Sequence, residues 1–339
     1  MRKSVEAEEY HSKDFEWEEL KNLVESDPSL SHHVRFRHDH ESQGHDLGED
    51  RDSFAQVDPQ AWQNFHARHS SGKFFKERRY LLKEFPELLP HGENSKLLEV
   101  GCGNGSTVLP ILRGCQNLTV YACDCSTEAL VRTKENIDHS TVTSDNFHSF
   151  CCDFSRFEFP KWLACDHCRE NVLDKQIGSH SDASCPSHEL SSVQPTEEHR
   201  SADVSSKSPS TGDQCCIGGV DFVTLIFTLS AVPQKRMPRA IKECYSVLKP
   251  GGLLLFRDYG LYDMTMLRFE PEKCVGFREY MRSDGTLSYF FCLDTVKRLF
   301  TGAGFIEVEL EYCCVKSVNR RKGKMMNRVW VHGKFQKPK

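Results

Sequence analysis

Short apolar runs separated by amphipathic stretches predict alternating strands and helices. The apolar run at 97–100 stops at a cluster of glycines, and apolar residues resume at 108 with the spacing of one helical face. Residues 220–232 are apolar almost without interruption, as expected of a parallel strand whose sheet is covered on both faces. The pattern therefore predicts an α/β fold around a mostly parallel sheet.

The rest of the chain continues this alternation. The predicted strands span 97–100, 118–123, 148–154, 220–232, 253–257, 305–312 and 328–335, and the predicted helices span 127–136, 237–248 and 293–301, in addition to one that begins at 107. The sequence Lys249-Pro250-Gly251-Gly252 is expected to end the helix before the fifth strand. The last two strands predict an antiparallel hairpin near the carboxyl end.

Two segments depart from the alternation. Residues 1–57 are rich in His, Glu, Asp and Ser, so we expect disorder there apart from a short helix near 15–24. Residues 165–216 are dominated by Ser, His, Asp, Glu and Pro and predict a low-complexity insertion between the third and fourth strands. The chain thus divides into an acidic region at 1–57, an aromatic and basic extension at 58–95 and a domain at 96–339 that the insertion interrupts.

The glycine cluster after the first strand has the pattern Glu99-x-Gly101-x-Gly103-x-Gly105. Glycine lets the backbone turn sharply and lets a ligand lie against peptide groups at a helix N-terminus. A dinucleotide site would need a third glycine where this chain has Ser106. The loop instead resembles the cofactor loop of class I S-adenosylmethionine-dependent methyltransferases, in which an acidic residue precedes the turn.

Two acidic residues follow at the ends of the next strands. Asp124 follows the second strand, and a carboxylate there can accept hydrogen bonds from both ribose hydroxyls of a nucleoside cofactor. An ordinary surface aspartate that closes a strand is the alternative. Asp153 and Phe154 end the third strand, where in this fold class an acid reaches the adenine amino group and an aromatic ring lies beside the adenine.

Charge is distributed unevenly along the chain. The formal net charge is −5, yet from Ala231 onward 21 Lys and Arg face 11 Asp and Glu. Residues 316–339 include nine basic side chains and no acidic one. A basic surface for nucleic acid would explain this asymmetry, and a solvated basic tail is the alternative.

Cysteine content and the first residues set an expected location. The 339 residues include 16 cysteines and open without an apolar leader, so we expect reduced thiols in the cytoplasm, with the nucleus as a second location. No window approaches the roughly 20 apolar residues of a membrane-spanning helix. The cysteines of the insertion, including Cys165 and Cys168, lack the spacing of paired zinc ligands, so we expect no metal site.

Aromatic and basic residues interleave between 61 and 89. The basic side chains there include Lys73, Lys76, Arg78 and Arg79. Base stacking beside phosphate-binding cations accounts for this pattern, and an amphipathic helix packed on the domain accounts for the aromatic residues equally well.

Further motifs lie outside the glycine loop. They are Trp62-Gln-Asn-Phe65, Lys73-Phe-Phe-Lys-Glu-Arg78, Leu225-Ile-Phe-Thr-Leu-Ser-Ala-Val232, Arg257-Asp-Tyr-Gly-Leu-Tyr-Asp263, Met266-Leu-Arg-Phe269, Arg282-Ser-Asp-Gly-Thr286, Tyr289-Phe-Phe291, Asn319 and Arg328-Val-Trp330. Together they resemble the tRNA N3-methylcytidine methyltransferase family, from 60 to 336 apart from the insertion. The resemblance implies a Rossmann-like sheet of seven strands with helices on both faces. It also implies methyl transfer from S-adenosylmethionine to N3 of a cytidine in the tRNA anticodon loop.

The same resemblance implies the site residues, position by position. The cofactor would be bound by Trp62, Phe65, His66, Glu99, Gly101, Gly103, Asp124, Asp153, Phe154 and Ile226, and the cytidine by the catalytic residues Arg257 and Asp258. The tRNA would be bound by Lys73, Phe74, Lys76, Arg78, Arg79, Arg268, Arg282, Arg320, Arg321, Lys322, Lys324 and Arg328. The family usually has Tyr where this chain has His66, so an imidazole would replace a phenol at that position.

Methylation at cytosine N3 makes modest chemical demands. N3 has an in-plane lone pair, so positioning supplies most of the catalysis and no strong base is needed. The base must be unpaired and extruded to expose N3. Because the product is cationic, a buried carboxylate that faces the ring would stabilise it, and Asp258 is the candidate. An ion pair between Arg257 and Asp258 is the alternative.

The sequence leaves two other functions open. A methyltransferase that acts on a protein or small molecule could use the same loop, although 229–232 lacks the Asn/Asp-Pro-Pro-aromatic motif of exocyclic-amine methyltransferases. A catalytically silent RNA-binding subunit would keep the fold, but the intact glycines and acids argue against it. For the tRNA enzyme, the family implies that a tRNA-charging enzyme or another accessory protein can be required.

Overall fold

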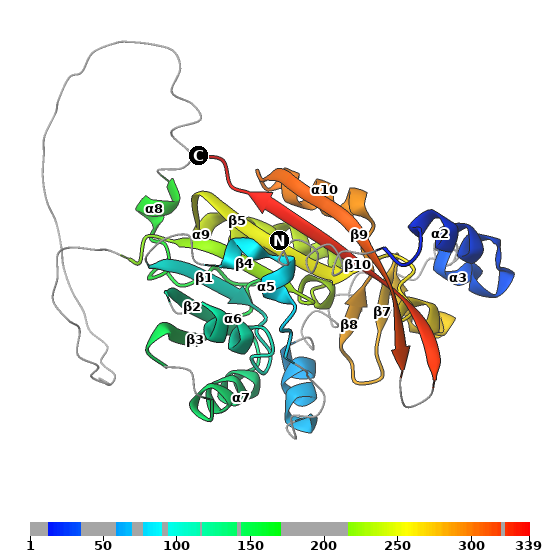
Figure 1. Cartoon of the computed structure of the whole chain (residues 1–339), viewed down its shortest axis with the longest axis horizontal. Helices are drawn as coiled ribbons and strands as arrows, with labels where there is room; N and C mark the ends of the chain where they lie inside the picture. The colour runs from blue at the N-terminus through cyan, green and yellow to red at the C-terminus, as the bar shows by residue number, and fades with distance from the viewer. Residues whose placement is uncertain are drawn as a thin grey trace, which may run out of the picture.

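A seven-stranded sheet forms the centre of the computed structural model, which describes residues 13–34, 59–69, 77–89, 94–115, 117–140, 144–170, 216–319 and 323–339. The strand order is β3-β2-β1-β4-β5-β10-β9 (Figure 1). The strands are β1 (Ser95–Val100), β2 (Leu118–Asp124), β3 (Phe147–Cys151), β4 (Val220–Ile226), β5 (Leu248–Tyr259), β9 (Ile306–Asn319) and β10 (Lys324–Gln336). The first five are parallel, and β10 runs antiparallel to β5 and β9. The predicted sheet and its terminal hairpin are thereby confirmed, although β3 and β4 end at Cys151 and Ile226, before the predicted ends at 154 and 232.

Helices cover both faces of this sheet. They are α2 (Trp17–Ser26), α3 (Ser31–Val34), a helical segment at 59–68, α5 (Leu81–Glu84), α6 (Val108–Gly114), α7 (Thr127–Asp138), α8 (Asp166–Glu170), α9 (Met237–Val247) and α10 (Leu293–Gly302). Successive strand residues point to opposite faces. Leu97 and Leu255 therefore join a core cluster with α6. Leu98 and Phe256 join the cluster that contains α9 and α10. Figure 1 shows α6 and α7 beside β1–β3 and α10 alongside β9.

Strand β5 and the final hairpin are longer than the sequence predicts. The pairing of β5 with β4 has an irregular register, which lets β5 begin at Leu248 and continue through Pro250. Strands β9 and β10 pair as far as Asn319 and Lys324. Toward that end of β9 the side chains of Lys316 and Val318 are exposed, so the apolar alternation that marks a half-buried strand is lost there.

A second, antiparallel sheet lies outside the predicted elements. Its strands are β6 (Cys274–Gly276), β7 (Glu279–Met281) and β8 (Leu287–Tyr289). Strands of three residues are too short to show a period in the sequence. Tyr280 and Tyr289 are buried in the main core, so this sheet is part of the same packed body.

Residues 13–34 are packed against the domain, which corrects the expectation of disorder for 1–57 in this part. Trp17 stacks on Tyr312 of β9 with a centroid distance of 4.7 Å. Leu20 of α2 is 7% exposed and belongs to the core. The partners of this segment come from the far end of the chain, so local composition could not reveal the packing.

Residues 77–89, which lie in the predicted extension at 58–95, also belong to the core. Leu81, Phe85 and Leu88 are buried against α6 and β1. The rest of 1–57 and most of the predicted insertion lie outside the described residues. Within the described part of the chain, no helix combines the length and apolar character that a membrane crossing requires.

Candidate active site

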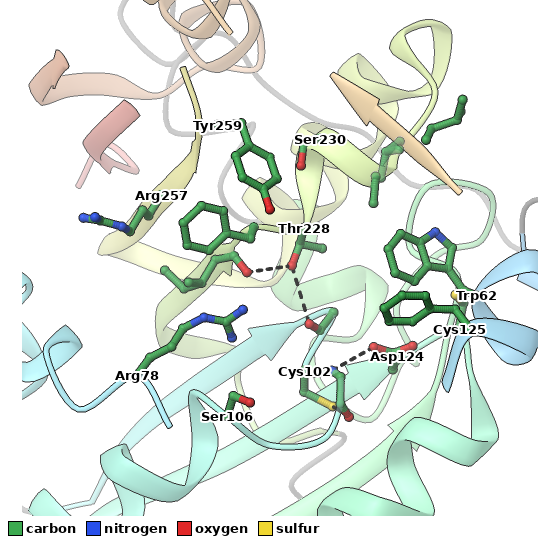
Figure 2. Close-up of a pocket in the computed structure, with 18 of the residues that line it drawn as sticks. Trp62, Arg78, Cys102, Ser106, Asp124, Cys125, Thr228, Ser230, Arg257 and Tyr259 are labelled. Atoms are coloured by element: carbon green, nitrogen blue, oxygen red, sulfur yellow. Dashed lines mark hydrogen bonds between the residues drawn. The ribbon is translucent and has the colours of Figure 1, made fainter. Parts of the chain in front are cut away.

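A cavity of about 790 Å³ lies at the carboxyl ends of the parallel strands, where ligands bind in open α/β sheets. The wall is formed by the loops after β1–β4, the end of β5, residues within β9 and β10, and the helical segment 59–68. Figure 2 shows part of this wall. All the predicted cofactor residues except Glu99 line it, namely Trp62, Phe65, His66, Gly101, Gly103, Asp124, Asp153, Phe154 and Ile226. The structure therefore brings the predicted cofactor residues together in one space.

The glycine loop has a backbone conformation that suits glycine. The φ angles of Gly101 and Gly103 are +68° and +55°. The N–H groups of Gly101 and Cys102 both donate to the carbonyl oxygen of Cys123, at 2.8 and 3.0 Å, and fix the loop to the end of β2. A Cβ atom on Gly101 would lie 2.3 Å from the methyl carbon of Thr228. The loop thus has no room for a side chain at its first glycine.

We expect Gly101→Ala to lower the free energy of unfolding by about 2 kcal/mol or more, because it adds backbone strain to a steric clash. Adding Thr228→Ala to the same chain removes the nearest clashing atoms and should recover part of the loss, while the φ penalty remains. Urea unfolding of the single and double variants measures both effects. A Gly101→Ala variant as stable as the wild type would contradict this geometry.

Two carboxylates stand beside the loop with capacity for further hydrogen bonds. Asp124 accepts the N–H groups of Gly103 and Ser126, both at 2.9 Å. Asp153 Oδ1 accepts the N–H and hydroxyl groups of Ser155. Its buried Oδ2 lies 3.5 Å from the Arg236 guanidinium and accepts no hydrogen bond among the described residues. Ribose hydroxyls and an adenine amino group are donors of the kind these oxygens can still accept. The glycine loop and the two acids therefore fit S-adenosylmethionine.

The helical segment 59–68 closes one side of the cavity. Figure 2 shows Trp62 close to Asp124, and the Trp62 ring packs edge-on against Phe65 at 5.3 Å. The Ser126 hydroxyl donates to Gln63 of this segment at 2.9 Å. Burial lowers the pKa of His66, although the charge of Asp124 acts in the opposite direction. The imidazole at this position is therefore a mainly neutral part of the wall at pH 7.

Glu99 lies beneath the loop rather than in the cavity wall. It pairs directly with Thr224 across β1 and β4, and the Thr224 hydroxyl donates to its carboxylate. Burial raises the pKa of Glu99 to about 7, against the opposing effects of the Thr224 hydrogen bond and the Arg78 charge. Glu99 therefore joins two strands below the site and, unlike the other predicted cofactor residues, does not line the cavity.

The raised pKa of Glu99 predicts a pH dependence of stability. The folded-state value of about 7 exceeds the ordinary value of 4.5. Between these values the folded chain holds a proton that the unfolded chain has released, so the free energy of unfolding should fall as pH rises through this window. Glu99→Gln should make this decrease shallower. Urea unfolding at pH 5 and pH 8 compares the two chains, and parallel pH profiles would contradict the prediction.

Arg257 and Asp258 do not face the cavity together. They are consecutive in β5, so their side chains point to opposite faces of the sheet. Arg257 lines the cavity and forms an ion pair with the buried Glu84. Asp258 is fully buried and accepts the N–H groups of Ser230 at 2.9 Å and Tyr259 at 2.8 Å. The expected carboxylate facing the base and the alternative Arg257–Asp258 ion pair are both replaced by this arrangement.

Burial also raises the pKa of Asp258 to about 6, although its hydrogen bonds oppose that rise. The Asp258 carboxylate fixes the backbone at the end of β5 and in the turn Leu229–Ala231 after β4. Its role in this structure is therefore to hold two segments of the cavity wall in place.

Glu84 is the carboxylate that compensates Arg257, and the sequence did not single it out. It also contacts His332 Nδ1 at 3.0 Å, and both Glu84 and His332 are fully buried. Arg257 and His332 pair directly across β5 and β10. Burial alone would raise the pKa of Glu84. The charges and hydrogen bonds of Arg257 and His332 lower it by more, so the pKa lies below the ordinary value of 4.5.

The predicted RNA-binding residues are divided by the structure. Arg78, Arg282 and Arg328 line the cavity. Arg79 and Arg268 are not among its lining residues, and the exposed Arg79 pairs with Glu77 at 2.9 Å. Lys73, Phe74, Lys76, Arg320, Arg321 and Lys322 lie outside the described residues, and Lys324 is described only as the first residue of β10.

The cavity also contains residues that the sequence did not single out as a site. Phe227, Thr228, Tyr259 and Trp330 all line it. Each is in a motif quoted above, but their meeting depends on strand register, since Tyr259 pairs directly with Trp330 across β5 and β10. Over the ranges that the structure describes, no three His, Cys, Asp or Glu side chains gather as metal ligands.

Known proteins similar to this chain agree on its class. Residues 74–310 match the model of a methyltransferase domain family. The tRNA N(3)-methylcytidine methyltransferase Mettl2 of Drosophila melanogaster is 33% identical over 300 residues, which are 86% of this chain and 74% of that protein. The tRNA N(3)-cytidine methyltransferase METTL6 of Homo sapiens is 35% identical over 281 residues, 82% of this chain and 79% of that protein. The tRNA N(3)-cytidine methyltransferase METTL2 of Danio rerio is 31% identical over 312 residues, which are 81% of this chain and 72% of that protein.

Proposed function

Because this chain belongs to the family of tRNA N3-cytidine methyltransferases, we propose that it methylates N3 of a cytidine in the anticodon loop of certain tRNAs. The observation that carries the proposal is a single cavity with two parts. One part has Gly101, Gly103, Asp124 and Asp153, which fit S-adenosylmethionine. The wall of the other part includes Phe227 just after β4, Arg257 and Tyr259 near the end of β5, and Trp330 within β10.

The chemistry needs orientation more than acid or base catalysis. S-adenosylmethionine, when bound, supplies a methyl group on a cationic sulfur, and cytosine N3 takes it with its own lone pair while the carbon–sulfur electron pair stays on sulfur. N3 has no proton to lose, so no side chain has to act as a general base. The loop and the two acids hold one reactant, and the aromatic part of the cavity holds the other, which is the positioning that accelerates such a transfer.

A cytidine can enter this cavity only when it is unpaired and extruded. Arg282 and Arg328 are in the cavity wall, and Arg328 Nε donates to Asp263 at 2.9 Å, which fixes its direction. The basic surplus at 316–339 supports contact with tRNA phosphates. We also propose phosphate contacts for Arg79 and Arg268. The same proposal covers the predicted basic residues outside the described ranges, which are Lys73, Lys76, Arg320, Arg321 and Lys322.

The proposal includes the surroundings of the reaction. An accessory protein, such as a tRNA-charging enzyme, is proposed on the basis of the family resemblance alone. The cytoplasm and the nucleus are the proposed locations, because tRNA is present in both.

The test is incubation of the purified chain with total tRNA and S-adenosylmethionine carrying a labelled methyl group, followed by nucleoside mass spectrometry. Label is expected in N3-methylcytidine, and label in another nucleoside instead would overturn the substrate assignment. A parallel incubation with a tRNA-charging enzyme tests the accessory partner. Calorimetric titration with S-adenosylhomocysteine should show binding, and its absence would favour a silent subunit.

A further inference from the structure

Three aromatic rings from different elements form one wall of the cavity. Phe227 follows β4, Tyr259 ends β5 and Trp330 lies in β10. The centroid of Phe227 is 5.1 Å from that of Tyr259 and 6.5 Å from that of Trp330. Figure 2 shows Tyr259 across the pocket from Cys102, with its hydroxyl directed toward Thr228. We call these three side chains the aromatic wall.

The aromatic wall adjoins the cofactor part of the cavity. Thr228 directly follows Phe227, and its methyl group would touch a Cβ atom on Gly101. Arg78, whose N–H group donates to the carbonyl oxygen of Ser106 at 2.8 Å, places its guanidinium 5.5 Å from the Phe227 ring. A planar ligand against the wall would therefore lie beside a ligand against the glycine loop.

Phe227 is held in a strained backbone conformation. Its φ angle is +56°, which for a bulky residue is an outlier that costs on the order of 1–3 kcal/mol. The N–H group of Phe227 donates to the carbonyl oxygen of Arg257 at 2.7 Å, and the Thr228 hydroxyl donates to that of Val100 at 3.0 Å. These bonds maintain a conformation that packing alone would not favour. Strain of this kind is concentrated at functional sites.

The charges around the cavity give the aromatic wall a second role. Among the described lining residues, the carboxylates are Asp124 and Asp153, and both belong to the cofactor part. Asp258 is turned away, and the charge of Arg257 is balanced by Glu84. Guanidinium groups already lie over two of the rings: Arg78 is 5.5 Å from the Phe227 centroid, and Arg257 and Arg328 are 4.5 and 5.1 Å from the Trp330 centroid. The methylated base carries a positive charge, and among the described lining residues the Tyr259 ring is the aromatic face of the wall that remains to meet it. Aromatic faces attract cations by about 0.5–2 kcal/mol.

We propose that the aromatic wall receives the extruded cytosine by stacking, and that the Tyr259 ring binds the cationic methylated base more tightly than the neutral one. This inference rests on the proposed function and assigns the base subsite to Phe227, Tyr259 and Trp330. It also replaces Asp258 with the ring face of Tyr259 as the source of charge stabilisation. The wall then stabilises the transition state selectively, since positive charge develops on the base during transfer.

The test compares Tyr259→Leu, which removes a ring face, with Tyr259→Phe, which keeps it. We expect Tyr259→Leu to lower kcat/KM for tRNA by about tenfold to a hundredfold, as for the loss of base stacking. Tyr259→Phe should stay within about threefold of the wild type, and Phe157→Leu, at a 63% exposed position outside the cavity, should leave activity unchanged. Calorimetric titration with S-adenosylhomocysteine should give the same affinity for all four chains, which shows that each variant is folded.

A second measurement isolates the charge preference. N3-methylcytidine 5′-monophosphate should inhibit the wild type more strongly than cytidine 5′-monophosphate, and Tyr259→Leu should bring the two inhibition constants closer together. Equal inhibition of the wild type by the two nucleotides, or an unchanged ratio in the variant, would overturn the inference. The wild type would still place label in N3-methylcytidine in that case, so the proposed function would survive. Failure of the wild type to do so would count against the proposed function itself.

Discussion

Asp124→Ala is expected to weaken the binding of S-adenosylhomocysteine by about a hundredfold or more. The Asp124 carboxylate accepts the N–H groups of Gly103 and Ser126, and it is one of two acids at the cofactor part of the cavity. Its removal deletes charge-assisted hydrogen bonds to the ligand, each worth about 1.5–3 kcal/mol, and it also frees the loop. Two such bonds correspond to more than two powers of ten in affinity.

Calorimetric titration measures this loss directly. Asp124→Asn, which keeps the shape but not the charge, should give an intermediate affinity. Asp138→Ala removes an exposed carboxylate at the end of α7 and should bind like the wild type. A wild-type affinity for Asp124→Ala would remove this residue from the cofactor site.

Glu84→Ala is expected to lower the free energy of unfolding by about 3–5 kcal/mol. The substitution leaves the Arg257 guanidinium buried without its carboxylate, and an uncompensated buried charge costs about this much. It also deprives His332 Nδ1 of its partner at 3.0 Å. Urea unfolding at pH 7 measures the change.

Two comparison chains keep this prediction specific. Glu128→Ala breaks a partly exposed ion pair with Arg132 and should cost less than about 1 kcal/mol. Arg257→Met added to Glu84→Ala should restore much of the stability, because the buried guanidinium charge that lost its carboxylate partner is then removed as well. A double variant no more stable than Glu84→Ala would show that the ion pair is not the cause.

The lowered pKa of Glu84 fixes the direction of its pH effect. Burial alone would raise that pKa, but Arg257 and His332 bring it below the ordinary value of 4.5. The stabilisation is then fully present above pH 4.5 and is lost as pH falls through the folded-state value. This direction is opposite to that of Glu99, whose pKa is raised.

Much of the fold was predictable because its signals are local. Apolar runs mark the parallel strands, and the glycine at position 101, with φ of +68°, marks a turn that other residues would strain. The positions of Asp124 and Asp153 at the cavity edge of the sheet were also predictable, since each lies at or just after the carboxyl end of a strand that the pattern recognises. The three-residue strands β6–β8 and the packing of α2 were not, because neither has a local period that could reveal its partners.

The part of the cavity that contains Arg257 and the aromatic wall was harder to predict, because its residues are brought together by pairing between strands that are distant in the sequence. The alternation of side chains along β5 already implies that Arg257 and Asp258 face opposite ways. The partner of Arg257 lies 173 positions earlier in the chain, and no sequence spacing indicates it. The meeting of Tyr259 and Trp330 likewise follows from the register of β5 against β10.

The position of Glu84 upstream of the first strand also sets the smallest unit that can fold. A fragment starting at residue 94 would keep all seven strands of the sheet and every glycine of the loop. It would nevertheless lack Glu84, the buried carboxylate that forms an ion pair with Arg257. A fragment trimmed to the sheet should therefore be insoluble when expressed. A fragment that retains residues 77–89 keeps Glu84 and the apolar side chains that pack on α6, so it should stay soluble.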